Sequence, residues 1–150
     1  MTRLAQLFQN QVLWCTFLAW IVAQGLKIFL AFRREGRFDS RWLLGTGGMP
    51  SAHSAGVTAL ATGVGLEMGF HTAGFAIATI FALVTMFDVQ GVRRAAGRQA
   101  VALNKIIDEV YSKGQVSEER LKELLGHTPI EVFAGASIGC FLAVLICRPY

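Results

Sequence analysis

The sequence predicts an all-α integral membrane protein, a bundle of about four transmembrane helices with additional cytoplasmic amphipathic helices. Hydrophobic residues make up 53% of the 150 residues, and 24 residues are charged. Residues 33–41 and 93–125 carry 18 of those charges, so long apolar runs remain between them. A small soluble domain has a large surface to cover with polar groups, which this distribution does not allow. The composition also excludes disorder, collagen and a disulfide scaffold.

Three long apolar runs define the expected spans. The first run contains one cation, Lys27, and is long enough for a bilayer, which needs about 20 residues. The second run is too long for one crossing but suits two short helices that are joined by a turn at Gly69–Gly74. The expected spans are residues 12–32, 52–69, 73–91 and 130–147, with polar loops at 33–50 and 93–129, all in one domain of residues 1–150.

Each crossing switches sides, so the two polar loops lie on the same side of the membrane. They hold eleven of the 14 Lys and Arg residues, and the positive-inside rule therefore places them in the cytoplasm and both termini opposite. Within the second loop, apolar spacing predicts an amphipathic helix over Ala95–Tyr111, and Ser117 is a candidate N-cap of another short helix. The basic excess favours membrane lipids as partners over nucleic acid.

The segment Gly45–Ser54, with the sequence GTGGMPSAHS, is a glycine-rich loop that leads into a helix start. Backbone amides at Gly48 and around Ser51, together with the positive end of the helix dipole, suit a phosphate. His53 lies about one turn into the helix, within reach for proton exchange. The alternative is a structural loop with a capping Ser51 and a histidine at the membrane interface, because glycine-rich loops alone are weak signals.

The segment His127–Glu131 is the second candidate. Thr128, Pro129 and Glu131 match a capping box with proline at N1, so Glu131 has a structural explanation. If the helix extends back to His127, Glu131 lies at i+4 on the same face. The carboxylate would then hold one ring nitrogen and leave the other as a nucleophile or base.

Several charged residues lie at the same membrane border as the two histidines. Lys27 and Arg34 are seven residues apart and share a helix face, although a lysine near a border can also snorkel. Asp88 is costly in lipid unless it is paired, so we expect Lys27, Arg93 or Arg94 near it. Two histidines, a carboxylate and several cations on one face are the groups that phosphoryl transfer requires.

These segments resemble the type 2 phosphatidic acid phosphatase superfamily, which includes vanadium haloperoxidases, and most of all its short divergent membrane branch. Pro50–His53 resembles the motif P-S-G-H, with Ala52 for glycine. Lys27 and Arg34 match the spacing of K-x6-R-P, with Glu35 for proline, and His127 and Glu131 resemble H-x3-D. The family arginine six residues before this histidine is absent, since position 121 is Leu. Residues 87–97, with Gln99 and Asn104, resemble the signature of the branch, and the resemblance covers about residues 20–145.

The resemblance implies that His127 attacks phosphorus to form a phosphohistidine, that Glu131 orients it, and that His53 protonates the leaving oxygen and then activates water. It also implies phosphate binding by Lys27, Arg34, Ser51 and the backbone amides of the glycine-rich loop, at Gly48 in particular. In place of the absent family arginine, Arg94 or Arg93 is our own candidate, and Asp88 is either half of a structural ion pair or a supporting part of the site. No metal and no cofactor are implied.

The leading hypothesis is therefore a membrane phosphatase that hydrolyses a lipid or prenyl phosphate or diphosphate at the cytoplasmic face. A haloperoxidase is conceivable, because vanadate mimics phosphate, but membrane spans favour a lipid substrate. The alternative is a non-catalytic membrane protein that binds or moves an anionic phospholipid. A purely structural interpretation explains the spans but not the clustering of His53, His127 and the cations. Four short spans are few to enclose an active site, so a homodimer is a further alternative.

Overall fold

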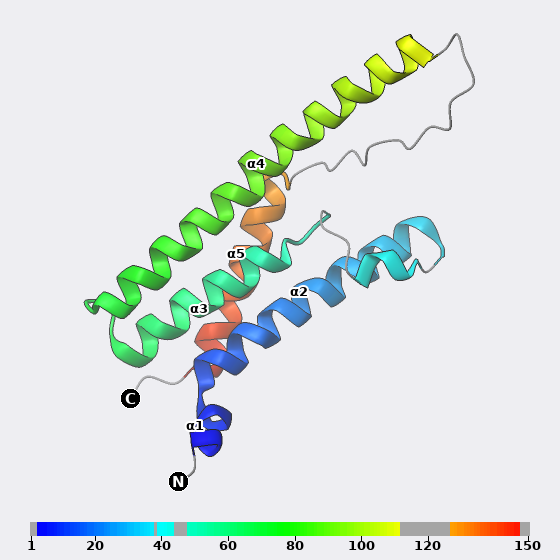
Figure 1. Ribbon diagram of the computed structural model, residues 1–150. Helices are drawn as coiled ribbons and strands as arrows, with labels where there is room; N and C mark the ends of the chain where they lie inside the picture. Colours follow the sequence, from blue (N-terminus) through cyan, green and yellow to red (C-terminus); the bar gives the residue numbers. More distant parts are fainter. Residues whose placement is uncertain (1–2, 38, 44–47, 112–126, 148–150) are drawn as a thin grey trace.

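The computed structural model describes residues 3–37, 39–43, 48–111 and 127–147. Its elements are α1 (Arg3–Gln9), α2 (Gln11–Glu35), the 3₁₀ helix η1 (Ser40–Leu43), α3 (Ala52–Met68), α4 (Ala73–Tyr111) and α5 (Pro129–Ile146). The described residues contain no strand, which confirms the all-α class. In Figure 1, α3 lies between α2 and α4, and α5 crosses behind it. All three neighbours pack directly against α3, which is therefore the central helix.

Three helical segments among the described residues are long and apolar enough to cross a membrane: α2, the first part of α4 (Ala73–Gln90) and α5. The remaining expected span, 52–69, corresponds to α3, which has 17 residues. At 1.5 Å per residue it is about 25 Å long, shorter than the hydrocarbon core of about 30 Å. The protein is thus a multi-pass integral membrane protein, but the expected number of four spans is not confirmed.

The third expected span continues without a break into the segment for which we predicted a loop. Helix α4 has 39 residues and ends only at Tyr111, so it is about 58 Å long and extends well beyond the hydrocarbon core. The expected helix at 95–111 is its second half rather than a separate element. No proline interrupts this stretch, and its Ala, Arg and Gln residues favour continued helix. The expected helix at Ser117 lies outside the described residues.

Capping residues account for where the helices begin and end. Asn10 accepts a hydrogen bond from the Leu13 amide, 2.8 Å away, and begins α2 after the short helix α1, which the sequence reasoning did not predict. Gly36, with φ of 68°, ends α2 in the left-handed region that favours glycine. The predicted turn at Gly69–Gly74 is present, and Gly69 also has a positive φ, of 98°.

Small residues form the centre of the bundle, and large apolar residues lie outside. The buried core cluster consists of Val12, Cys15, Ala19, Ala23, Ala52, Ala55, Ala59, Ala143 and Cys147. Small side chains let helix backbones approach closely, as is typical of membrane bundles. Phe81, Phe133 and Phe141 are each more than half exposed, which suits contact with lipid rather than with water.

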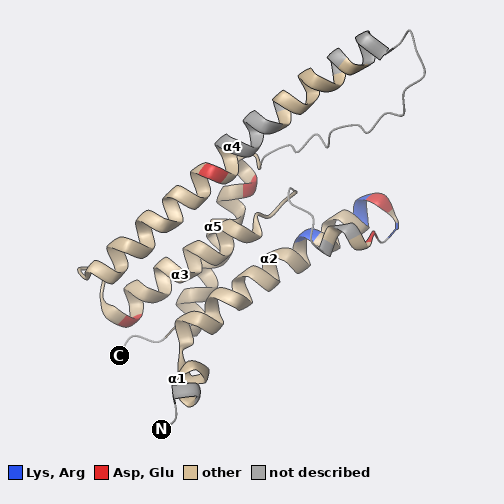
Figure 2. Cartoon of the chain, in the orientation of Figure 1, with Lys and Arg blue, Asp and Glu red and all other residues tan. Residues whose placement is uncertain are grey.

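The described charges gather at the end of the bundle where α2 ends and where α3 and α5 begin (Figure 2). Glu67 lies in the last turn of α3, at the opposite end of that helix and near its turn into α4. Three helix termini from distant parts of the sequence thus converge on one polar end. The candidate functional residues belong to these termini.

Candidate active site

A backbone hydrogen bond joins the two histidine-bearing segments. The amide of Ser51, which precedes α3, donates to the carbonyl oxygen of Glu131 in the first turn of α5 at 3.0 Å. About two turns further along α3, the Thr58 hydroxyl donates to the Ser54 carbonyl at 2.7 Å and also lies 3.1 Å from the Ala136 carbonyl oxygen of α5, so it again links the two helices. The beginnings of the two helices are therefore held side by side, whereas the convergence of the His53 and His127 side chains stays a prediction.

Two glycines of α5 make this close approach possible. A Cβ atom on Gly135 would collide with the backbone carbonyl of Ser51, and one on Gly139 would collide with the carbonyl of Ala55. The spacing of four residues places both glycines on the same face of α5. The sequence shows this small-residue spacing, but only the structure shows that the two glycines pack against the N-cap and the first turns of α3.

His127 and Glu131 form the pair that the spacing predicts. The His127 side chain is only 2% exposed, and its Nδ1 lies 2.9 Å from Glu131 Oε2. The same carboxylate oxygen accepts a hydrogen bond from the Thr128 amide at 3.0 Å, and the Thr128 hydroxyl accepts one from the Glu131 amide at 3.4 Å. Glu131 is thus both the partner in the capping box and the partner of His127. The two interpretations of this residue are compatible.

The pairing indicates which nitrogen of His127 would react. An ionised carboxylate only accepts hydrogen bonds, so the Nδ1 atom that faces Glu131 is the donor. In the neutral ring, Nε2 then carries the lone pair. This tautomer is assigned from the hydrogen-bond geometry, and it is the one that a nucleophile acting through Nε2 requires.

Lys27 reaches the same junction from α2. Its side chain is half-buried, and its aliphatic stem passes Gly48, where an added Cβ would lie 3.4 Å from Lys27 Cδ. Gly48 has φ of +85°, a conformation that favours glycine. Lys27 is also close enough to Glu131 for the two charges to interact. Lys27 therefore approaches the His127–Glu131 pair, and its expected role in binding phosphate stays a prediction.

Ser51 acts as the N-cap of α3. It is completely buried, and its hydroxyl oxygen accepts hydrogen bonds from the Ser54 amide at 3.3 Å and from the Ser54 hydroxyl at 3.1 Å. The capping role that the sequence suggested is therefore present, whereas contact of Ser51 with phosphate stays a prediction. Ser54, also completely buried, was missed by the sequence reasoning, although its position three residues after an N-cap could have indicated it.

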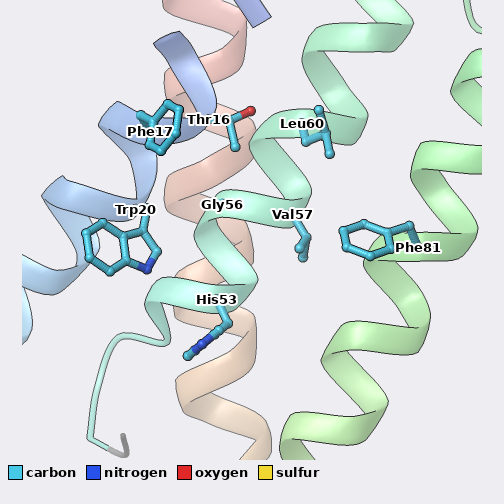
Figure 3. Close-up of a pocket in the computed structure, with 8 residues that line it drawn as sticks. All are labelled: Thr16, Phe17, Trp20, His53, Gly56, Val57, Leu60 and Phe81. Atoms are coloured by element: carbon cyan, nitrogen blue, oxygen red, sulfur yellow. The ribbon is translucent and has the colours of Figure 1, made fainter. Parts of the chain in front are cut away.

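His53 occupies the first turn of α3 and is half-buried. Figure 3 shows its ring at one end of an apolar groove, with Trp20 of α2 on one side and Phe81 of α4 on the other. The N-terminus of α3 directs the positive end of its dipole, and amides without intrahelical partners, towards the same polar end of the bundle. An anion in front of α3 would therefore be stabilised near both histidine-bearing segments.

Other expected site residues are not brought into this junction by a described contact. Arg34 is exposed in the last turn of α2. Asp88 is exposed on α4 and has no ion-pair partner among the described side chains. Arg93 and Arg94 lie in α4, but their side chains, like residues 44–47 of the glycine-rich loop, are outside the described part of the structure. Their expected roles remain predictions.

Comparison with known proteins covers nearly the whole chain. The model of a family described as the divergent PAP2 family matches residues 8–142. The chain is also 42% identical over 152 residues to the uncharacterized membrane protein YuiD of Bacillus subtilis (strain 168), with 94% of this chain and 96% of that protein covered. No solved structure matches significantly. The resemblance on which the sequence reasoning relied is thereby confirmed.

Proposed function

Because the chain belongs to the divergent PAP2 family, we propose that it is a membrane phosphatase that hydrolyses a lipid or prenyl phosphate or diphosphate. The observation that carries the proposal is the junction of α3 and α5, where the Ser51–Glu131 hydrogen bond holds the His53 segment against the His127–Glu131 pair. A purely structural role would not require a buried histidine oriented by a carboxylate beside a half-buried lysine.

In the first step, the lone pair of His127 Nε2 attacks phosphorus, and the bond from phosphorus to the leaving oxygen breaks. Glu131 holds Nδ1–H and stabilises the positive charge that develops on the ring. Protonated His53 gives its proton to the leaving oxygen, which departs as the alcohol of a monophosphate or the lipid monophosphate of a diphosphate. The product is a phosphohistidine.

In the second step, His53, now neutral, accepts a proton from water as the water oxygen attacks phosphorus. The P–N bond breaks, its electron pair returns to His127 Nε2, and inorganic phosphate leaves. Lys27 and the N-terminus of α3 would stabilise the negative charge on the phosphoryl oxygens in both steps.

The test is phosphate release by the purified protein in lipid nanodiscs, measured with a panel of lipid and prenyl phosphates and diphosphates. We expect His127→Ala to abolish release, and His127→Asn, which keeps a polar side chain of similar size, to be equally inactive. Equal release by the wild-type protein and His127→Ala would show that the nucleophile is wrongly assigned. A wild-type protein that binds these lipids without hydrolysing them would support the alternative, a non-catalytic lipid-binding protein.

The polar end is proposed to face the cytoplasm, with both chain termini on the other side. This orientation rests on the concentration of Lys and Arg in the segments at 33–50 and 93–129. Single cysteines introduced at Asp39 and Thr72, in a chain without its three native cysteines, would be labelled from opposite sides of the membrane. Labelling of position 39 from outside the cell would overturn the orientation.

A further inference from the structure

An apolar groove begins at His53 and continues into the membrane-facing part of the bundle. It has a volume of about 350 Å³ and is formed by three helices. Residues of α3 from His53 to Leu60 form its floor, Phe17 and Trp20 of α2 form one wall, and Phe81 of α4 forms the other (Figure 3). Among the described residues that line it, His53 is the only ionisable one, and it lies at the end nearest the candidate active site.

The groove is open to the side, where its walls are exposed. Phe17, Trp20 and Phe81 are 52%, 43% and 54% exposed. All three lie on helical segments that are long and apolar enough to cross the membrane. In the bilayer these exposed walls meet lipid chains, so a chain can enter the groove laterally while its polar head stays at the surface.

Gly56 lines the groove on the side of α2. A Cβ atom at this position would lie 3.8 Å from Trp20 Cβ and 4.0 Å from the Thr16 carbonyl oxygen, which are ordinary contact distances. Alanine would therefore fit, whereas a longer side chain would have to extend into the groove or displace α2. His53 and Leu60 are seven residues apart, which corresponds to about 10 Å along α3.

We propose that this groove binds the first part of one hydrocarbon chain of a membrane lipid phosphate, with its head group beyond His53 at the junction of α3 and α5. The volume lies at the lower end of the range for ligand pockets, which suits one chain rather than two. The apolar walls match the chain, and the single ionisable group marks where the chain meets the phosphate. The phosphate as head group rests on the proposed function, whereas binding of the chain rests on the groove alone.

The test is photocrosslinking with a single-chain hexadecyl phosphate that carries a diazirine a few carbons from the head group. The probe is added to the full-length protein in nanodiscs, and the labelled peptides are identified by mass spectrometry. We expect labelling to concentrate at Trp20, Val57 and Phe81. Gly56→Leu should reduce labelling there at least about fivefold, because each methylene excluded from the groove loses its burial energy, whereas Gly25→Leu should leave it unchanged, since nothing lies within 4 Å of Gly25.

A second pair of variants covers the case in which Gly56→Leu does not fold. Phe81→Ala removes one exposed wall of the groove and should reduce labelling of α3, whereas Phe141→Ala, an equally exposed position on α5 outside the groove, should not. Labelling that is spread evenly over the lipid-facing helices, or that persists in both Gly56→Leu and Phe81→Ala, would overturn the proposal.

Crosslinking does not require turnover, so the groove and the phosphatase activity can fail independently. Groove labelling of a protein that releases no phosphate would disprove the proposed function and support chain binding. Hydrolysis of phosphates without groove labelling would support the proposed function and disprove chain binding in the groove. If both hold, Gly56→Leu should raise KM for hexadecyl phosphate at least about tenfold while kcat/KM for water-soluble phenyl phosphate stays within about twofold. A probe with an isoprenoid chain distinguishes prenyl from straight chains.

Discussion

Replacing Glu131 with glutamine separates its role in orienting His127 from its role in capping α5. Glutamine keeps an acceptor oxygen for the Thr128 amide, which lies 3.0 Å from Glu131 Oε2, so the helix start should survive. The hydrogen bond to His127 Nδ1, 2.9 Å long, changes from charge-assisted to neutral. A charged partner contributes about 1.5–3 kcal/mol and a neutral one about 0.5–1.5 kcal/mol, so about 1–2 kcal/mol of stabilisation is lost.

That loss applies most strongly when the His127 ring becomes positively charged during attack on phosphorus. Since about 1.4 kcal/mol corresponds to a tenfold change in rate, we expect kcat to fall roughly 5- to 30-fold with KM nearly unchanged. The fall would be larger if the amide also allows the other tautomer of the ring. The assay is phosphate release at saturating substrate, combined with the melting temperature of the protein in detergent.

Nitrogen NMR of histidine-labelled protein supplies a readout that does not depend on activity. The chain has three histidines, so variants at His53 and His71 assign the His127 signals. Wild-type protein should show Nδ1 protonated, and Glu131→Gln should lower that fraction. Glu67→Gln is the matched control, because Glu67 is exposed at the opposite end of α3. An unchanged tautomer and unchanged kcat in Glu131→Gln would refute the reasoning.

Further predictions concern the packing and charge around the site. Gly135→Ala should destabilise the protein by about 1–3 kcal/mol and lower activity, because the added methyl group collides with the Ser51 carbonyl, whereas Gly25→Ala should be nearly neutral. Denaturant unfolding measures the stability of both variants. Equal stability of the Gly135→Ala and Gly25→Ala proteins would contradict the packing of α5 against Ser51. Thr128→Ala should cost about 1 kcal/mol through loss of the cap, and Thr128→Ser should restore most of it in the same assay. Lys27→Met should lower kcat/KM for lipid phosphates roughly 10- to 100-fold by removing a cation, and unchanged kinetics would exclude Lys27 from phosphate binding.

The parts of the site that depend on neighbouring residues in the sequence could be predicted. His127 and Glu131 meet because a helix start places residues four apart on one face. Thr128 and Ser51 cap helices where the sequence places a polar residue before an apolar run. Hydropathy likewise identified the membrane class and most helix boundaries, because the bilayer requires long apolar segments.

One predicted boundary differs because helix continuity outweighs local composition. The change from apolar to charged residues near residue 91 marks the expected membrane border, but a helix does not end where polarity changes unless its backbone is interrupted. Helix α3 has nearly the bounds expected for the second span, 52–69, but it is short and packs against α2, α4 and α5, so the expected number of four spans stays a prediction. Apolar composition alone does not distinguish a helix buried in protein from one that faces lipid.

Local sequence thus determined the membrane class, because that class depends on continuous apolar runs. It also determined the helix starts and the pairing of His127 with Glu131, because each of these depends on residues within about one helical turn of one another. Only the tertiary structure decided that Ser51 contacts Glu131, that Lys27 approaches the same carboxylate and that a groove leads away from His53. These contacts join segments that are far apart in the sequence. They depend on how closely small residues such as Gly135 and Gly56 let particular helices approach, and that distance is a property of the packed bundle.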